Sequence, residues 1–245
     1  MFEVDRYPGP DDRLDLTKAP IRLIRVAYQH SRFQKCRHFR PQSVVPPMQD
    51  KPDLAALIAS RICHDLISPI GAIGNGVELL AMDGGTQRPE MALISESVSN
   101  ANARIRFFRI SFGAATGDQR IARSEVMSVL TDLTRGGRVS YAWTSVADLP
   151  RREVRLAFLL LQCVETALAY GGKVAVVRDD MGWTIQAEAA RLRIDSALWE
   201  VLTEPRAPAD IGAGQVHFAL VPEELARQGR RLVTSIGETS IRLTF

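Results

Sequence analysis

Apolar residues recur every three or four positions from about residue 53 to residue 83, which predicts a long amphipathic helix. The apolar stripe comprises Leu54, Leu57, Ile58, Ile62, Leu66, Ile70, Ile73, Val77 and Leu80. Another side of this helix carries Ser60, His64, Ser68, Gly71 and Asn75. The pair Gly84-Gly85 is expected to end it, because glycine favours the backbone conformation that follows a helix C-terminus.

A second helix is expected from Pro89, a residue suited to the first helical turn, to about Phe112. Its apolar contacts would come from Met91, Leu93, Ile94, Val98, Ala101, Ile105, Phe108 and Ile110. Two helices joined by a short turn form a hairpin, which buries its apolar faces poorly by itself. Since two such hairpins related by a twofold axis make a four-helix bundle, the sequence predicts a homodimer with one His64 exposed on each flank.

Residues 117–245 alternate between helical and strand-like periods. Helices are expected at 124–134, 150–170, 196–202 and 215–228, and strands at 139–145, 173–178, 183–189, 231–235 and 240–245. Between two of these strands, Asp179-Asp180-Met181-Gly182 is typical of a β-hairpin turn. This order predicts an α+β protein in which a helical hairpin, residues 51–116, precedes an α/β sandwich with helices on one face of a sheet, residues 117–245.

Charge sets the first fifty residues apart. They hold nine Lys or Arg against six Asp or Glu, whereas residues 51–245 hold 22 of each, so the whole net charge of +3 lies in the first segment. Its six prolines interrupt any long element, which predicts a flexible basic leader over residues 1–50. A basic arm for nucleic acid or anionic lipid is the alternative, although no recognised motif supports it. We also expect that translation naturally starts at Met48.

Composition limits the function classes. A chain of 245 residues with 46% hydrophobic and 24% charged residues is expected to form one or two soluble domains. No secretory pattern opens the sequence, and no apolar run is judged long enough to span a bilayer, so a cytoplasmic location is expected. Cys36, Cys63 and Cys163 are an odd number without paired spacing, which favours reduced thiols.

The clearest candidate chemistry lies in the segment His64-Asp65-Leu66-Ile67-Ser68-Pro69-Ile70. A neutral imidazole nitrogen is nucleophilic and can carry a covalent group between two reactions. Asp65 can orient the ring or accept its proton, and Ser68, one helical turn further on, would project from the same face as His64. Pro69 crowds the preceding turn and is expected to bend the helix just past the ring, leaving the ring accessible. This pattern indicates phosphoryl transfer.

The same residues carry a family resemblance. Arg61 to Ile70 resembles the phospho-acceptor box of histidine kinases, in which a histidine, an acidic residue and a proline recur in this order. The longer run from Ser60 to Leu80 is similar to that of the alphaproteobacterial histidine phosphotransferase family named ChpT. The likeness covers about residues 51–245, and only its acceptor helix is specific. A surface histidine on an ordinary amphipathic helix is the bland alternative.

The resemblance also extends to the ATP-binding domain of histidine kinases, and here the sequence departs from the family pattern. Gln162 and Thr166 stand where an active kinase has asparagines that hold magnesium. The segment Glu188–Arg193 replaces the adenine-binding Asp-x-Gly-x-Gly loop, and Gly212-Ala213-Gly214 is all that remains of the phosphate loop. We therefore expect a degenerate domain that binds no ATP.

Without a nucleotide site, the phosphoryl group must come from another protein. The ChpT resemblance implies the phospho-aspartate of a receiver domain on a hybrid histidine kinase as donor. It implies response regulators, including CtrA-like cell-cycle regulators, as acceptors. The receiver would supply Mg²⁺ and a cationic side chain, so this chain needs no cofactor or metal of its own. Neither direct nucleic-acid binding nor membrane association is expected.

Seven residues are assigned to the candidate site. His64 is the expected acceptor, Asp65 its orienting or proton-accepting partner, and Ser68 a modest contributor. Residues placed for partner docking are Arg61, Ile67, Gly71 and Asn75, the last three following His64 on adjacent turns; ordinary helix packing explains those three equally well. Arg61 would meet phosphoryl oxygens or remain a solvated charge.

The same ambiguity applies to arginines of the second helix, Arg104, Arg106 and Arg109, whereas His217 is expected to pack within its own helix. Two rival functions stay open. One is an ATP-dependent histidine kinase with divergent nucleotide motifs, and the other is a non-catalytic scaffold that binds receivers.

Overall fold

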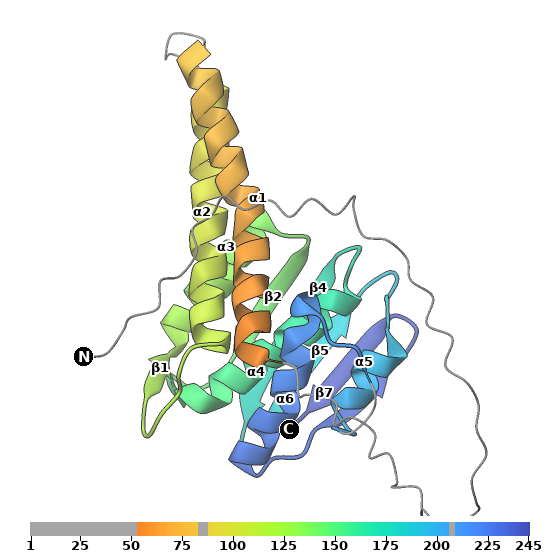
Figure 1. Ribbon diagram of the computed structural model, residues 1–245. Coiled ribbons are helices and arrows are strands. Elements are labelled where there is room, and N and C mark those ends of the chain that lie inside the picture. Colours follow the sequence, from red (N-terminus) through yellow and green to blue (C-terminus); the bar gives the residue numbers. More distant parts are fainter. Residues whose placement is uncertain (1–52, 83–87, 206–208) are drawn as a thin grey trace, which may run out of the picture. The chain divides into compact units, whose positions relative to one another are not determined.

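A computed structural model describes residues 53–82, 88–205 and 209–245 (Figure 1). These residues belong to one compact unit, Asp50–Phe245. The expected leader, the Met48 start, Cys36 and the Gly84-Gly85 turn lie outside the described residues.

The first two helices form the expected antiparallel hairpin (Figure 1). Helix α1 spans Leu54–Met82 and α2 spans Arg88–Ser111. The side chain of Asp53 caps the N-terminus of α1. Its Oδ1 accepts hydrogen bonds from the backbone N–H groups of Ala55 at 3.0 Å and Ala56 at 3.2 Å. Helix α1 is continuous through Pro69, and the expected bend there stays a prediction.

A five-stranded mixed sheet follows, with strand order β2-β4-β5-β7-β6. The strands are β2 (Val139–Thr144), β4 (Gly172–Asp179), β5 (Gly182–Glu188), β6 (Val233–Ile236) and β7 (Ser240–Thr244). Among the described strands only β2 and β4 pair in parallel, and α4 (Arg151–Ala167) makes the crossover between them. The β4–β5 hairpin turns where the sequence predicted, with Asp179 opposite Gly182 and φ +131° at this glycine.

Helix α4 lies at the centre of the core. Eleven of its seventeen residues are buried, since it packs against α2, α6 (Val216–Gln228) and the sheet (Figure 1). Helix α3 (Arg123–Gly136) contacts α2, and the short helices α5 (Ser196–Val201) and η1 (Ala213–Gln215) contact α6. Phe107 of α2 stacks on Phe158 of α4 with ring centroids 4.9 Å apart. The hairpin and the sheet therefore share one hydrophobic core.

Some expected boundaries were wrong. A two-stranded ribbon of β1 (Arg120–Ala122) and β3 (Asp148–Pro150) was not predicted, because three-residue strands are too short to display a period. Pro150 ends β3, so α4 begins at Arg151, and it stops at Ala167 rather than at residue 170. Helix α3 begins at Arg123, and its cap position, Ala122, forms no side-chain capping bond.

The apolar stripe of α1 is only partly covered. Ile70 and Val77 remain 59% and 53% exposed, as expected of a hairpin that buries its apolar faces poorly by itself. Residues Leu54–Leu80 also have the length and mean hydropathy, 1.3, of a helix that could cross a membrane. This corrects the expectation that no apolar run was long enough, although one such helix is weak evidence for a membrane span.

Cys63 is exposed and Cys163 buried, and both are free thiols. Burial raises the pKa of the Cys163 thiol well above its ordinary value. The expectation of reduced cysteines therefore holds for these two residues.

Candidate active site

His64 projects from α1 into solvent, with 85% of its side chain exposed. Its ring nitrogen Nδ1 lies 3.2 Å from Oδ1 of Asp65. Because a carboxylate can only accept a hydrogen bond, this contact places a proton on Nδ1, so of the two neutral tautomers of the ring it favours the Nδ1-protonated one. In that tautomer the second ring nitrogen, Nε2, has its lone pair available for reaction.

The side chain of Asp65 is more buried than the His64 ring that it contacts. Only 15% of its side chain is exposed, and its second oxygen, Oδ2, lies 3.0 Å from Nη2 of Arg61 one helical turn earlier. Arg61 also donates from Nη1 to the backbone carbonyl of Gly214, at 2.6 Å. A chain of contacts therefore runs from His64 through Asp65 and Arg61 to the turn before α6.

Ser68 lies on the neighbouring turn but makes no hydrogen bond with His64 within the described part of the chain. It lines, together with Asp65, a cleft of about 310 Å³ between α1, α2 and the end of α3. The opposite wall includes Ser97, Asn100 and Arg104. The expectation that Ser68 and His64 share one helix face fits this arrangement, and direct contact between them is not observed.

Ile67, Gly71 and Asn75 are all exposed on α1. A Cβ atom added at Gly71 would meet nothing within 4 Å, whereas one added at Gly76 would lie 2.6 Å from the side chain of Ile94. Packing within this chain therefore explains the glycine at position 76 but not the one at position 71. Ile67 is 68% exposed, so helix packing does not account for it either.

Three arginines of α2 form ion pairs with neighbouring helices. Arg104 pairs with Glu165 of α4 at 3.0 Å, and the other pairs are Arg106–Asp132 at 2.9 Å and Arg109–Glu125 at 2.8 Å. Burial acts to lower the pKa of Arg104, but the charges of Glu165 and Asp65 outweigh it and raise that pKa. These ion pairs fix the three side chains to neighbouring helices, and their contact with phosphoryl oxygens stays a prediction.

Two contacts in this chain were not predicted from the sequence. Gly214 lies 153 residues from Arg61, and a backbone acceptor leaves no side-chain signal. The pairing of Arg61 with Asp65 was visible as an i, i+4 spacing, which is the usual spacing of helix ion pairs. The solvated-charge alternative for Arg61 is corrected, because its side chain is only 17% exposed and contacts Asp65 and Gly214. Contact between Arg61 and phosphoryl oxygens stays a prediction.

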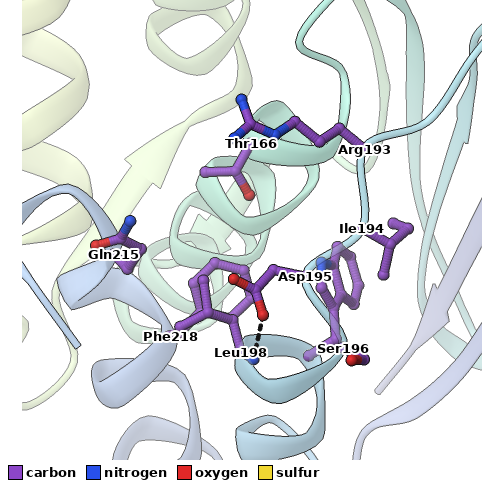
Figure 2. Close-up of a pocket in the computed structure, with 9 residues that line it drawn as sticks. Thr166, Arg193, Ile194, Asp195, Ser196, Leu198, Gln215 and Phe218 are labelled. Atoms are coloured by element: carbon purple, nitrogen blue, oxygen red, sulfur yellow. Dashed lines mark hydrogen bonds between the residues drawn. The ribbon is translucent and has the colours of Figure 1, made fainter. Parts of the chain in front are cut away.

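A larger pocket of about 610 Å³ lies between α4, α5 and the η1–α6 segment (Figure 2). Its polar lining includes Thr166, Arg193, Asp195, Ser196 and Gln215. Thr166 donates to the carbonyl of Cys163 at 2.6 Å, and Asp195 accepts from the backbone N–H of Leu198 at 3.4 Å. Gln162 does not line this pocket but is buried in α4. Among the described residues, no group of three or more His, Cys, Asp or Glu could hold a metal ion.

Known proteins resemble this chain over most of its length. The family model described as "Histidine phosphotransferase C-terminal domain" matches residues 123–240. The protein phosphotransferase ChpT of Brucella abortus (strain 2308) is 36% identical over 182 residues, which cover 71% of this chain and 87% of that protein. The chain belongs to the ChpT family of protein phosphotransferases. The family recognised from the acceptor helix is thereby confirmed.

A solved structure of a bacterial phosphotransferase is 33% identical to this ChpT-family chain. The match covers 81% of this chain and 98% of the chain in that structure, with a TM-score of 0.68. A histidine kinase domain from Erythrobacter litoralis EL346 is 11% identical, with a TM-score of 0.38. The chain is a histidine phosphotransferase of a phosphorelay, with a mixed helix and sheet fold.

Proposed function

We propose that His64 is the residue that carries the phosphoryl group. The observation behind this assignment is the exposed ring whose Nδ1 faces Asp65, because that contact leaves Nε2 as an accessible nucleophile. Docking onto a receiver would bring Nε2 in line with the phosphorus of a phospho-aspartate.

In the forward step, Nε2 forms a bond to phosphorus while the bond from phosphorus to the aspartate oxygen breaks. The receiver aspartate leaves as a carboxylate, and the ring gains positive charge. Asp65 stabilises that charge by accepting the hydrogen bond from Nδ1. Mg²⁺, supplied by the receiver, would screen the transferred oxygens. Attack by the aspartate of a second receiver then returns the ring to its neutral state.

Ser68 is assigned a modest role on its position alone. It lies one turn beyond His64 and lines the cleft next to Asp65. A hydroxyl there can position an incoming phosphoryl oxygen or a water molecule.

The docking surface is assigned to Ile67, Gly71 and Asn75, with the receiver of a hybrid histidine kinase as donor. Response regulator receivers, including CtrA-like regulators, would be the acceptors. The exposed apolar side chain of Ile67 and the open surface at Gly71 support close approach of another protein. We place this reaction in the cytoplasm, with residues 51–116 as the phosphotransfer hairpin and residues 117–245 as the degenerate kinase-like domain.

We also propose that the chain uses no ATP. Two of the polar side chains that line the 610 Å³ pocket, those of Thr166 and Asp195, form hydrogen bonds with backbone groups of their own helices. Figure 2 shows the bond to Asp195. The glycine turn at 212–214 directs a carbonyl toward Arg61. A carbonyl is an acceptor and does not bind phosphate.

Dimerisation through the hairpin is supported by an exposed apolar seam. On α2 the seam comprises Met91, Val98 and Ile105, spaced by seven residues, and on α1 Ile70 and Val77 have the same spacing. A repeat of seven residues keeps one face of a helix toward a partner helix. A second copy of this hairpin would cover the seam and complete a four-helix bundle.

The test uses the purified chain and a receiver domain carrying a labelled phospho-aspartate. Wild type is expected to gain acid-labile, base-stable label, and His64→Ala is expected to gain none. His217→Leu removes the other described histidine and should retain the label. Labelling of wild type by ATP alone would favour the kinase alternative, and unchanged signalling output with His64→Ala would favour the scaffold alternative.

A further inference from the structure

Arg61 occupies a position between the acceptor pair and the C-terminal part of the chain. Its two terminal nitrogens make separate contacts, Nη2 with Oδ2 of Asp65 at 3.0 Å and Nη1 with the carbonyl of Gly214 at 2.6 Å. A guanidinium is planar and holds its donors in a fixed fork, so it constrains both partners at once.

The guanidinium of Arg61 determines which oxygen of Asp65 points toward the His64 ring. With Oδ2 held by Arg61, the other oxygen, Oδ1, points toward Nδ1 of His64. Which imidazole nitrogen carries the proton is set by the hydrogen bond that the ring makes. The orientation of Asp65 therefore decides whether Nε2 or Nδ1 is the available nucleophile.

The three side chains in this chain of contacts differ in burial. The side chains of Arg61 and Asp65 are 17% and 15% exposed, whereas that of His64 is 85% exposed. Within the described residues, the Nε of Arg61 is buried without a hydrogen-bond partner, which costs free energy and makes a casual surface contact a poor explanation. An incoming phosphoryl group would reach the ring more readily than it would reach Arg61.

We propose that Arg61 is a positioning residue for phosphoryl transfer. It acts through Asp65 to keep the proton on Nδ1 of His64, and it takes its own position from the carbonyl of Gly214. In this arrangement the turn that remains of the phosphate loop supports the acceptor helix. This inference rests on the assignment of His64 as acceptor.

The experiment compares wild type with Arg61→Met, which removes the charge, and Arg61→Lys, which keeps the charge but lacks the fork. Arg109→Met is the matched control, because it also removes an arginine–carboxylate pair from the hairpin, the one with Glu125 of α3. Transfer from a phosphorylated receiver is expected to slow roughly tenfold in both Arg61 variants and to stay at the wild-type rate in the control.

Two further measurements distinguish positioning from a purely structural role. Nitrogen-15 NMR of the His64 ring should report the Nδ1-protonated form in wild type and a shift toward the Nε2-protonated form in Arg61→Met and Arg61→Lys. In a protein that already carries Asp65→Asn, adding Arg61→Met should slow transfer no further. The effects of two substitutions do not add when one residue acts through the other.

Wild-type rates with an unchanged ring form in both Arg61 variants would overturn the inference, and so would effects that add to those of Asp65→Asn. If Arg61→Met does not fold, Arg61→Lys alone decides between these outcomes. Failure of wild type to be labelled at His64 would instead refute the proposed function.

Discussion

At the scale of single residues, Gly71 offers a way to separate helix packing from docking. Glycine in a helix interior costs about 1 kcal/mol relative to alanine, and a Cβ atom here has open space. Gly71→Ala should therefore raise the thermal midpoint, while the added methyl group hinders a docking receiver and slows transfer. Unfolding curves and transfer rates measured on one preparation would check both effects. A stabilised variant that transfers at the wild-type rate would leave Gly71 without a docking role.

His217 gives a second prediction, on stability against pH. Its side chain is fully buried in α6, and burial, together with the charge of Arg61, lowers its pKa to about 3. Between pH 6.5 and 3 the unfolded chain binds a proton that the folded chain does not, so acidification in this range destabilises the fold.

The free energy of unfolding should fall by up to about 2 kcal/mol from this group between pH 6.5 and pH 5. In His217→Leu this pH-dependent fall should be absent. The variant should also match or exceed the stability of wild type at pH 7, because both nitrogens of the buried His217 ring lack partners among the described residues. Urea denaturation at pH 7 and pH 5 measures the difference. An equally steep pH dependence in the variant would contradict the assignment.

The contact between His64 and Asp65 and the burial of His217 were both predictable from sequence, because each depends on neighbours along one helix. The anchor at Gly214 was not predictable. It requires the chain to return to α1 after 153 residues and uses a backbone oxygen that any residue type provides. Likewise, the spacing of Arg104 gave no reason to expect Glu165 as its partner.

At the scale of elements, the exposed seam of the hairpin predicts the oligomeric state. Val98 is 41% exposed and lies midway along the seam on α2. Val98→Glu should dissociate the dimer, since a charge desolvated at an apolar helix interface is strongly unfavourable. Light scattering after size-exclusion chromatography measures the mass. Met181→Glu, at the exposed tip of the β4–β5 hairpin, is the control and should remain dimeric; a dimeric Val98→Glu variant would argue for another interface.

Periodicity predicted the elements better than their ends. The strong apolar period located α1, α2 and the β4–β5 hairpin to within a few residues. It could not distinguish apolar residues buried within one chain from apolar residues that stay exposed, as Ile70 and Val77 illustrate, because both give the same pattern. The β1–β3 ribbon depends on pairing between distant segments, which no local pattern encodes.

At the scale of the whole molecule, the shared core predicts that the hairpin and the sheet unfold together. Phe107 of α2 is buried against Phe158 of α4, so Phe107→Ala should cost about 3–5 kcal/mol. All three tryptophans lie outside the hairpin, and their fluorescence should report this loss at the same urea concentration as far-UV circular dichroism. Met127→Ala, at a half-exposed site on α3, should change the midpoint little. An unaltered fluorescence transition in Phe107→Ala would mean that the two parts fold independently.

The exposure of the His64 ring also bears on how long a signal persists. On the proposed assignment, the nitrogen–phosphorus bond would stand in bulk water, since 85% of the side chain is uncovered. Little of the surrounding surface could delay hydrolysis, so the lifetime of the loaded state would follow the intrinsic chemistry of the phosphoramidate and the supply of partners. Such a carrier would pass the phosphoryl group on promptly and would not stay phosphorylated for long after its donor is exhausted.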